Sequence, residues 1–330
     1  MIVSLKSGSS FGIALGETIL QAAENNRIQL AYSCKIGRCN ACKSKVIQGE
    51  SQPLYEELGL TASEKAEGWI LSCVRIALTD LSLDVEDLGD YLLPQVKTLP
   101  CRISRIDKLT SDVMCVALRL PPTAEFSFIP GQYIELIGPG GVRRSYSLAN
   151  AKFLNKQLEL HIRAVEGGEL SQYWFGQAKV NDLLRLNGPL GTFFLRDVSG
   201  LDLVFMATGT GMAPVKAMLE SVQSFAYSQQ PRSVTVLWGG RTPQDFYFDA
   251  ARILSCFNFV PVLSRADSQW SGARGYVQQV LLSVLPNLGQ AAVYACGSEA
   301  MIRDARIQLT AAGLPNNRFY SDSFVCSAVN

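Results

Sequence analysis

Histidine is almost absent from this sequence of 330 residues, and His161 is the single example. One histidine gives little support to an acid–base triad. Net charge is also nearly absent, because 30 lysines and arginines face 29 aspartates and glutamates. Bulk electrostatics therefore favours neither a nucleic acid nor a membrane surface as partner.

Long hydrophobic runs are lacking too. No segment is apolar for long enough to span a bilayer, and the first residues lack the basic and apolar regions of a signal peptide. The chain is 48% hydrophobic and 18% charged, as ordinary globular chains are, and its length predicts two or three domains. We therefore expect a cytoplasmic protein. Five scattered cysteines are expected to be reduced thiols: Cys101, Cys115, Cys256, Cys296 and Cys326.

Four further cysteines follow a defined spacing. Cys34, Cys39 and Cys42 form a C-x4-C-x2-C series, and Cys73 comes later in the chain. Four thiolates complete a [2Fe–2S] cluster, and this is the spacing of plant-type ferredoxins. Three ligands in one short loop can bind one side of the cluster, while the fourth must return from a distant segment. The spacing predicts a [2Fe–2S] cluster.

Zinc binding and disulfide formation fit these cysteines less well. A structural zinc site usually has two C-x2–4-C pairs or a histidine partner, and His161 lies far away in the sequence. Disulfides are disfavoured because nothing marks the chain as secreted. Gly37 and Asn40 tolerate positive φ, so the loop can turn tightly and aim its N–H groups at the sulfurs.

Residues 1–92 predict a small domain around this loop. Short strands at 1–5 and 11–15 form a hairpin, and a helix starts near 16–18. Segments 69–73 and 81–85 are expected to be strands, the first of which delivers Cys73. This pattern resembles the β-grasp fold of plant-type ferredoxins throughout, although Asn40 stands where that family usually has glycine. A linker with Pro94 and Pro100 is expected over residues 88–100.

Residues 97–198 predict an antiparallel β-barrel or β-sandwich, and the resemblance given below implies the barrel. Short runs rich in β-branched and aromatic residues recur at 114–120, 133–137, 158–163 and 183–186, with turn residues between them. The segment 144–150 reads R-S-Y-S-L-A-N. It resembles the R-x-Y-S flavin motif of the ferredoxin–NADP reductase superfamily, although the tetrapeptide alone could be an ordinary half-buried strand.

The resemblance implies roles for these residues. Arg144 would bind the flavin pyrophosphate, Tyr146 would stack on the isoalloxazine ring, and Ser147 would hydrogen-bond near N5. The loop 168–171 is where FAD-binding members hold the distal phosphate, so FAD is preferred over FMN. Further cofactor-binding residues implied here are His161, Arg163, Gly168, Ser171 and Thr192. A lone histidine on a strand is equally consistent with local packing.

Residues 199–330 predict an α/β domain with a parallel sheet. Apolar runs at 203–207, 234–238, 259–263 and 291–296 alternate with helical segments. After the first run come Gly209, Thr210 and Gly211, leading into a helix whose N-terminus favours a phosphate. This segment resembles the G-T-G-x-A-P motif that binds NAD(P) in the same superfamily, with Thr208 in place of a common glycine.

Two later segments extend the resemblance. Cys296 and Gly297 end a strand at the carboxyl edge of the sheet, and in the superfamily they lie beside the nicotinamide. A buried structural thiol is the alternative for Cys296. The segment 319–324 ends in Phe324, and it resembles the S-D-x-F ending of relatives whose aromatic ring covers the flavin. The resemblance therefore implies a catalytic set of Tyr146, Ser147, Cys296 and Phe324.

Three arginines concern the choice between NADH and NADPH, because arginine can bind a 2′-phosphate. Arg265 follows a serine, as in NADPH-dependent members, and Arg241 and Arg274 are further candidates. All three could equally be solvated surface residues. The sequence leaves the preference open, with NADH favoured by the general resemblance.

The order of cluster, flavin and nucleotide domains makes the whole chain resemble the iron–sulfur flavoprotein reductases. This resemblance implies hydride transfer from NAD(P)H to FAD and single-electron transfer through the cluster to a partner enzyme. The partner would be a pyridoxamine-phosphate-dependent sugar 3-dehydrase of 3,6-dideoxyhexose biosynthesis. The alternatives are the oxygenase component of an aromatic dioxygenase or a monooxygenase, and a redox-sensing module without turnover.

Overall fold

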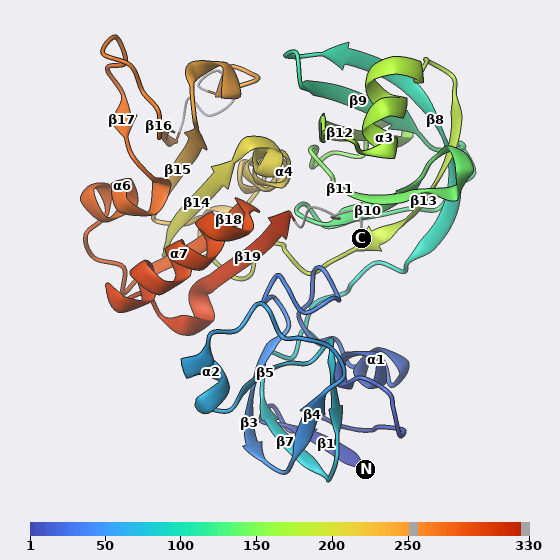
Figure 1. Cartoon of the computed structure of the whole chain (residues 1–330), viewed down its shortest axis with the longest axis vertical. Coiled ribbons are helices and arrows are strands. Elements are labelled where there is room, and N and C mark those ends of the chain that lie inside the picture. Colours follow the sequence, from blue (N-terminus) through green and yellow to red (C-terminus); the bar gives the residue numbers. More distant parts are fainter. Residues whose placement is uncertain (251–256, 325–330) are drawn as a thin grey trace. The chain divides into compact units, whose positions relative to one another are not determined.

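The computed structural model describes residues 1–250 and 257–324, so Cys256 and Cys326 lie outside the described residues. These residues form two compact units (Figure 1). One contains residues 1–93 together with 321–324, and the other contains residues 94–320. None of the described cysteines forms a disulfide. In the described ranges, no helix has both the length and the apolarity needed to cross a membrane.

The first unit is built on a mixed five-stranded sheet with the order β2-β1-β7-β3-β5. β1 pairs antiparallel with β2 and parallel with β7, which is the arrangement of a β-grasp fold. The strands are β1 (Ile2–Leu5), β2 (Ser10–Gly12), β3 (Lys43–Gln48), β5 (Trp69–Leu71) and β7 (Leu81–Asp84). A small second sheet pairs β4 (Ser51–Pro53) with β6 (Arg75–Ala77). The predicted hairpin and returning strands are confirmed.

Two short helices complete this unit, α1 (Ile19–Asn25) and α2 (Ala62–Ala66). The α1 helix begins after Thr18, whose side chain accepts from the Gln21 N–H while the Gln21 side chain accepts from the Thr18 N–H. This capping box satisfies two backbone donors that the helix itself leaves unpaired. Ile19, Leu20 and the alanines of α1 are buried against the sheet.

The second unit begins with a six-stranded antiparallel barrel, whose sheet order is β11-β10-β13-β8-β9-β12. An isolated bridge between Leu148 and Leu160 joins its two ends. The strands are β8 (Lys97–Lys108), β9 (Val113–Arg119), β10 (Tyr133–Ile137), β11 (Arg143–Ser147), β12 (Gln157–Arg163) and β13 (Leu183–Leu190). A buried apolar core fills the barrel, and the short helix α3 (Glu169–Gln172) contributes Leu170 to it.

The expected linker is shorter than predicted, because Pro100 lies inside β8 and pairs with Arg185 of β13. The neighbouring strand β9 pairs with β8 only from Arg102 onward. One edge of β8 is therefore unpaired at Pro100, where a residue without an N–H can be accommodated.

The same unit also contains a sheet with the order β17-β16-β15-β14-β18-β19. The five strands from β17 to β18 in this order run parallel. Its strands are β14 (Asp202–Thr208), β15 (Ser233–Gly240), β16 (Asn258–Leu263), β17 (Ala273–Arg274), β18 (Ala291–Ser298) and β19 (Phe319–Phe324), of which residues 321–324 are counted with the first unit. The helices are α4 (Met212–Val222), α6 (Val277–Val284) and α7 (Glu299–Ala311). The four predicted strands are confirmed, whereas β17 and β19 were not predicted.

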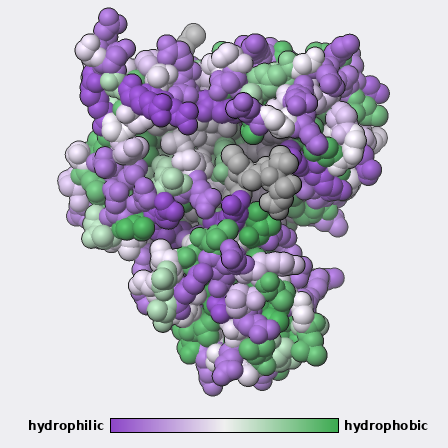
Figure 2. All heavy atoms as spheres, viewed as in Figure 1, coloured by the Kyte–Doolittle hydropathy of each residue, from purple (hydrophilic) through white to green (hydrophobic). Residues whose placement is uncertain are grey.

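Helices cover both faces of this parallel sheet. On β14, Phe205 packs in a core with residues of α4, whereas Val204 and Met206 pack in a second core with residues of α6 and α7. Burial on both faces explains the continuous apolar run in the sequence. In Figure 2, hydrophilic residues are interspersed with smaller apolar patches over the visible face.

Candidate functional site

The loop that carries three of the four predicted cluster ligands turns through left-handed backbone. Lys35, Gly37 and Asn40 have φ values of 56°, 76° and 66°. A Cβ on Gly37 would lie 2.7 Å from the Glu56 carbonyl oxygen, so glycine is required there. Asn40 has a positive φ of 66°, a conformation that asparagine tolerates better than most residues other than glycine.

The four cysteine side chains form two pairs in the structure. The Cys39 N–H and the Cys34 N–H each donate to the sulfur of the other residue at 3.3 Å. The Cys42 and Cys73 sulfurs lie 3.1 Å apart. Two pairs of sulfurs fit a cluster of two irons that each bind two thiolates. The ligand set itself stays a prediction.

Each pair of thiols contains one group of lowered and one of raised pKa. The hydrogen bond from Cys39 is the main cause that lowers the pKa of Cys34 to about 6, and the bond from Cys42 likewise lowers the pKa of Cys73, whereas the same two hydrogen bonds raise the pKa of Cys39 and Cys42. The Ile36 N–H donates to the Cys34 sulfur at 3.4 Å. Backbone donors of this kind stabilise a thiolate and tune the potential of a cluster.

Glu57 supports the segment that returns with Cys73, and sequence reasoning missed it. Its buried carboxylate accepts from the Leu71 N–H at 2.7 Å and forms an ion pair of 3.1 Å with Arg75. The Ser72 hydroxyl and N–H both donate to the Cys42 carbonyl at 3.1 Å. No local motif marks Glu57, because its partners come from another segment.

The predicted flavin residues lie on β11 and near it. Tyr146 accepts a hydrogen bond of 3.1 Å from the Trp174 indole, and burial raises the pKa of Tyr146 to about 12, so its phenol stays neutral. Ser147 is buried at the end of the strand. The half-buried Arg144 donates to the Arg143 carbonyl at 2.7 Å.

Trp174 also links Tyr146 to the predicted phosphate loop, because it follows α3 in the chain. Gly168 is the N-cap of α3, and the Ser171 hydroxyl accepts from the Val165 N–H at 2.9 Å. Thr192 lies after β13, is buried, and its carbonyl accepts from Arg196 at 3.1 Å. The structure thus connects Gly168 and Ser171 with Tyr146.

The two predicted nucleotide segments meet at the ends of β14 and β18. A Cβ on Gly297 would lie 2.1 Å from the Thr208 hydroxyl oxygen, and one on Gly211 would lie 2.2 Å from the Cys296 carbonyl oxygen. Thr208 accepts from the Ser298 N–H at 3.0 Å, so the residue that replaces a common glycine joins the two segments. Gly209 and Thr210 lie in the same turn, before α4.

His161 and Arg163 of β12 contact the segment that follows β15, at Tyr247 and Asp245. His161 is buried, with Nδ1 2.9 Å from the Tyr247 hydroxyl and Nε2 3.1 Å from Glu159. Arg163 forms 3.1 Å ion pairs with Asp112 and Asp245. Its guanidinium also lies 2.8 Å from where a Cβ on Gly209 would be, which places it beside the nucleotide turn.

The three arginines considered for a 2′-phosphate differ in their surroundings. Arg241 and Arg265 are exposed at the ends of β15 and β16, and the Arg265 N–H donates to the Arg241 carbonyl at 3.0 Å. The Arg274 guanidinium instead donates to three backbone carbonyls, those of residues 266, 267 and 270. Phe324 is partly exposed at the end of β19, and its predicted role over the flavin stays a prediction.

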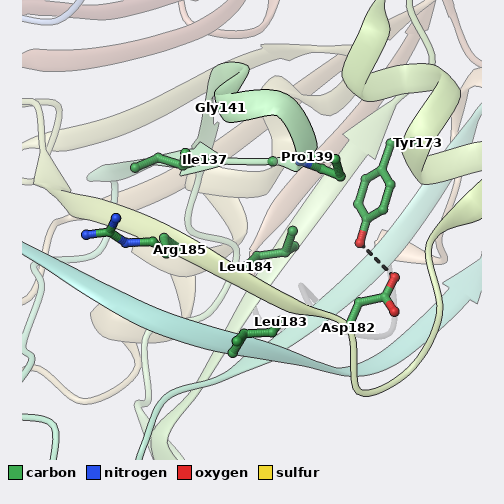
Figure 3. Close-up of a pocket in the computed structure, with 9 residues that line it drawn as sticks. Ile137, Pro139, Gly141, Tyr173, Asp182, Leu183, Leu184 and Arg185 are labelled. Carbon is green, nitrogen blue, oxygen red and sulfur yellow. Dashed lines mark hydrogen bonds between the residues drawn. The ribbon is translucent and has the colours of Figure 1, made fainter.

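A surface hollow of about 540 Å³ lies beside β10 and β13 (Figure 3). At one side the Tyr173 hydroxyl points to the Asp182 carboxylate and donates to it at 2.9 Å. Ile137, Pro139 and Arg185 also line this hollow. None of the predicted cofactor residues does so, and we therefore do not assign it to a cofactor.

Three family models match successive parts of the chain. The 2Fe-2S iron-sulfur cluster binding domain matches residues 5–78, and the oxidoreductase FAD-binding domain matches residues 100–195. The oxidoreductase NAD-binding domain matches residues 205–306. This order confirms the predicted cofactors: a [2Fe–2S] cluster, FAD and a nicotinamide nucleotide.

Individual relatives resemble nearly the whole chain. The CDP-6-deoxy-L-threo-D-glycero-4-hexulose-3-dehydrase reductase of Yersinia pestis is 43% identical over 314 residues, which are 94% of each chain. The reductase component of propane 2-monooxygenase from Rhodococcus jostii is 33% identical over 332 residues, 94% of this chain and 88% of the relative. Among solved structures, the Amycolatopsis cytochrome P450 reductase GcoB has a TM-score of 0.74 and 28% identity, covering 98% of both chains.

The paired cysteines, the flavin strand and the glycine turn before α4 thus occur in the order of the three matched domains. Because the likeness extends over nearly the full length of several reductases, the chain belongs to the iron–sulfur flavoprotein reductases, NAD(P)H-dependent oxidoreductases that bind FAD and a [2Fe–2S] cluster.

Proposed function

We propose that this reductase supplies electrons to a pyridoxamine-phosphate-dependent sugar 3-dehydrase in 3,6-dideoxyhexose biosynthesis. The observation that carries the proposal is the 43% identity, over 94% of the chain, to a reductase named for the CDP-hexulose dehydrase that it serves. The oxygenase reductases compared with this chain are less similar, at 31–33% identity.

When bound, FAD would supply two-electron hydride chemistry and the cluster would supply one-electron chemistry. The residues of this chain bind and orient these groups. Tyr146, held by Trp174, would present a neutral ring to the flavin, and the buried Ser147 hydroxyl would supply a hydrogen bond near N5. Arg144 has further N–H donors beyond the one used by Arg143, and we assign them to the pyrophosphate.

On the nucleotide side, the turn at Gly209 and Gly211 leads into the N-terminus of α4, where backbone N–H groups favour a pyrophosphate. Cys296 and Gly297 adjoin this turn and are proposed to border the nicotinamide. Gly168, Ser171 and Thr192 are proposed to hold the FAD phosphates, and Phe324 to cover the flavin. The exposed Arg241 and Arg265 are the candidates for contact with the adenosine ribose.

The first experiment separates the flavin from the cluster. We expect Cys42→Ser to lose electron transfer to one-electron acceptors by roughly 100-fold or more, because the cluster cannot form with three thiolates. Flavin reduction in anaerobic titrations with NADH and with NADPH should persist, and the two titrations rank the donors. Cys101→Ser, at a buried cysteine outside the cluster loop, is the control. Loss of flavin reduction in folded Cys42→Ser protein would refute the assignment of flavin reduction and one-electron transfer to separate cofactors.

The second experiment identifies the partner. Purified sugar 3-dehydrase and a purified monooxygenase hydroxylase are each added to the reductase, and substrate-dependent consumption of NADH is measured. The proposal expects turnover with the dehydrase at least about tenfold faster. Turnover with the hydroxylase alone would support the second candidate, for which the 33% identity to a propane monooxygenase reductase is the evidence. If NADH were consumed neither with these two proteins nor with artificial acceptors, a redox-sensing module would be favoured.

A further inference from the structure

A buried polar network joins the flavin barrel to the helix that begins at the nucleotide turn. Glu159 and His161 lie two residues apart on β12 and share one face of that strand. Lys216 and Glu220 lie four residues apart on α4 and share one face of that helix. The Lys216 side chain is 14% exposed and the Glu159 side chain is 24% exposed, so these charges are largely removed from water.

Lys216 is at the centre of the network. Its ammonium group lies 3.1 Å from the Glu159 carboxylate, 2.7 Å from Glu220 and 2.9 Å from the Ala149 carbonyl. These three acceptors match the three N–H donors of a lysine. Glu220 also accepts from the Ala151 N–H at 2.9 Å. Residues 149 and 151 immediately follow β11, so α4 is tied to the end of the flavin strand.

His161 continues the network toward the nucleotide turn. Burial lowers the pKa of His161, so the imidazole is neutral, and burial raises the pKa of the Tyr247 hydroxyl. Because the Glu159 carboxylate can only accept, Nε2 carries the proton and Nδ1 accepts from Tyr247. The hydrogen bond between His161 and Tyr247 therefore has only one direction, with the Tyr247 hydroxyl as donor.

Tyr247 in turn packs on Trp238, with ring centroids 5.1 Å apart. The Trp238 indole donates to the Gly209 carbonyl at 3.2 Å. The network thus reaches the flavin strand through Lys216 and Glu220, and the nucleotide turn through His161, Tyr247 and Trp238. A chain of satisfied, buried polar contacts allows few alternative arrangements of the two domains.

We propose that Lys216, Glu159, His161 and Tyr247 are positioning residues that lock the nucleotide turn to the flavin strand at the spacing needed for hydride transfer. They act through α4 and Trp238 rather than by touching the reacting atoms. Hydride transfer depends steeply on geometry, and a displacement of about 1 Å can slow a reaction by roughly 100-fold. Apolar packing could hold the two domains together equally well but would define their spacing less sharply.

A metal site is the alternative role for part of this network, since the Cys115 sulfur and the ligand atoms of Glu159 and His161 all lie within 4.8 Å of one another. Two observations oppose it. Glu159 already faces Lys216 at 3.1 Å and Arg105 at 3.8 Å. Burial also raises the pKa of Cys115 to about 11, which keeps it a thiol rather than a metal-binding thiolate.

The test uses the complete holoprotein in anaerobic stopped-flow reduction with NADH. Lys216→Met keeps an unbranched side chain, one atom shorter, and removes its three donors. We expect the limiting rate of flavin reduction to fall roughly tenfold or more, with a larger isotope effect from deuterated NADH. The Kd for NADH and the FAD content should change less than about twofold. Lys216→Arg should restore part of the rate, because it restores the charge and donors.

Tyr247→Phe provides a milder variant that keeps the ring and decides the matter if Lys216→Met does not retain FAD. Lys97→Met, at an ion pair within the barrel, and Tyr227→Phe, at an exposed tyrosine, are the matched controls. An unchanged limiting rate in FAD-loaded Lys216→Met or Tyr247→Phe would overturn the proposal. Binding of one zinc ion per chain by the unmodified protein, lost in Cys115→Ala, would also overturn it in favour of a metal site.

Discussion

Gly211 lies so close to Cys296 that an added Cβ would come within 2.2 Å of the Cys296 carbonyl oxygen and 2.9 Å of the next backbone nitrogen. Both of these atoms belong to the backbone at the end of β18. Rotation of a side chain therefore cannot relieve the steric clash. The close approach brings together two segments that are far apart in the sequence and that both resemble nucleotide-binding motifs.

Gly211→Ala should therefore separate the two segments. We expect the rate of flavin reduction by NADH to fall roughly 100-fold, since the turn and the end of β18 would be displaced from each other. FAD content and reduction by dithionite should be unchanged, because both depend on other residues. Stopped-flow absorbance measures both reductions. Gly176→Ala, where an added Cβ meets no atom within 4 Å, is the control, and an unaltered NADH rate in Gly211→Ala would contradict the assignment.

Gly37→Ala should impair assembly of the cluster. Its Cβ would lie 2.7 Å from the Glu56 carbonyl, and its φ of 76° is in the region that costs other residues roughly 1–2 kcal/mol. We expect the iron content per chain to fall by at least about half, with FAD content preserved. Iron and flavin are measured on the same samples, beside Gly12→Ala, whose Cβ would meet open space. A full complement of iron would show that the loop tolerates the change.

Glu159→Gln should change how stability depends on acidity. Burial raises the pKa of Glu159, but hydrogen bonding to His161 and the charge of Lys216 together outweigh burial and lower this pKa from 4.5 to about 2. Its stabilising contribution, at most roughly 3 kcal/mol, is therefore full above the unfolded pKa of 4.5. It is lost as the pH falls from there toward 2.

Glu159→Gln should accordingly have a lower Tm than the unmodified protein at pH 7. This gap in Tm between the two proteins should narrow as the pH falls below about 4.5. Thermal unfolding followed by tryptophan fluorescence measures the gap. Glu125→Gln, at a carboxylate that is 91% exposed, should show almost no gap at any pH. A gap for Glu159→Gln that stays constant with pH would mean that its charge contributes no stability.

The sequence by itself determined the cofactor regions and their order. The spacing of Cys34, Cys39 and Cys42 predicts a cluster loop because covalent neighbours limit which sulfurs can share one metal centre. The glycines at 209 and 211 predict a phosphate turn because backbone conformation is a local property. Strand periodicity likewise predicted the first hairpin, the antiparallel strands of the middle domain and the parallel sheet, while the resemblance to known families implied the β-grasp and the flavin barrel. The structure and the matched domains confirm this architecture.

Only the tertiary structure decided which distant residues meet. Nothing near Lys216 in the sequence indicates that its ammonium group lies 3.1 Å from Glu159, or that both ring nitrogens of His161 have protein partners. Likewise, Pro100 fits inside β8 only because β9 starts pairing further along the strand. Such contacts depend on how whole strands and helices pack, whereas sequence patterns report the preferences of neighbouring residues.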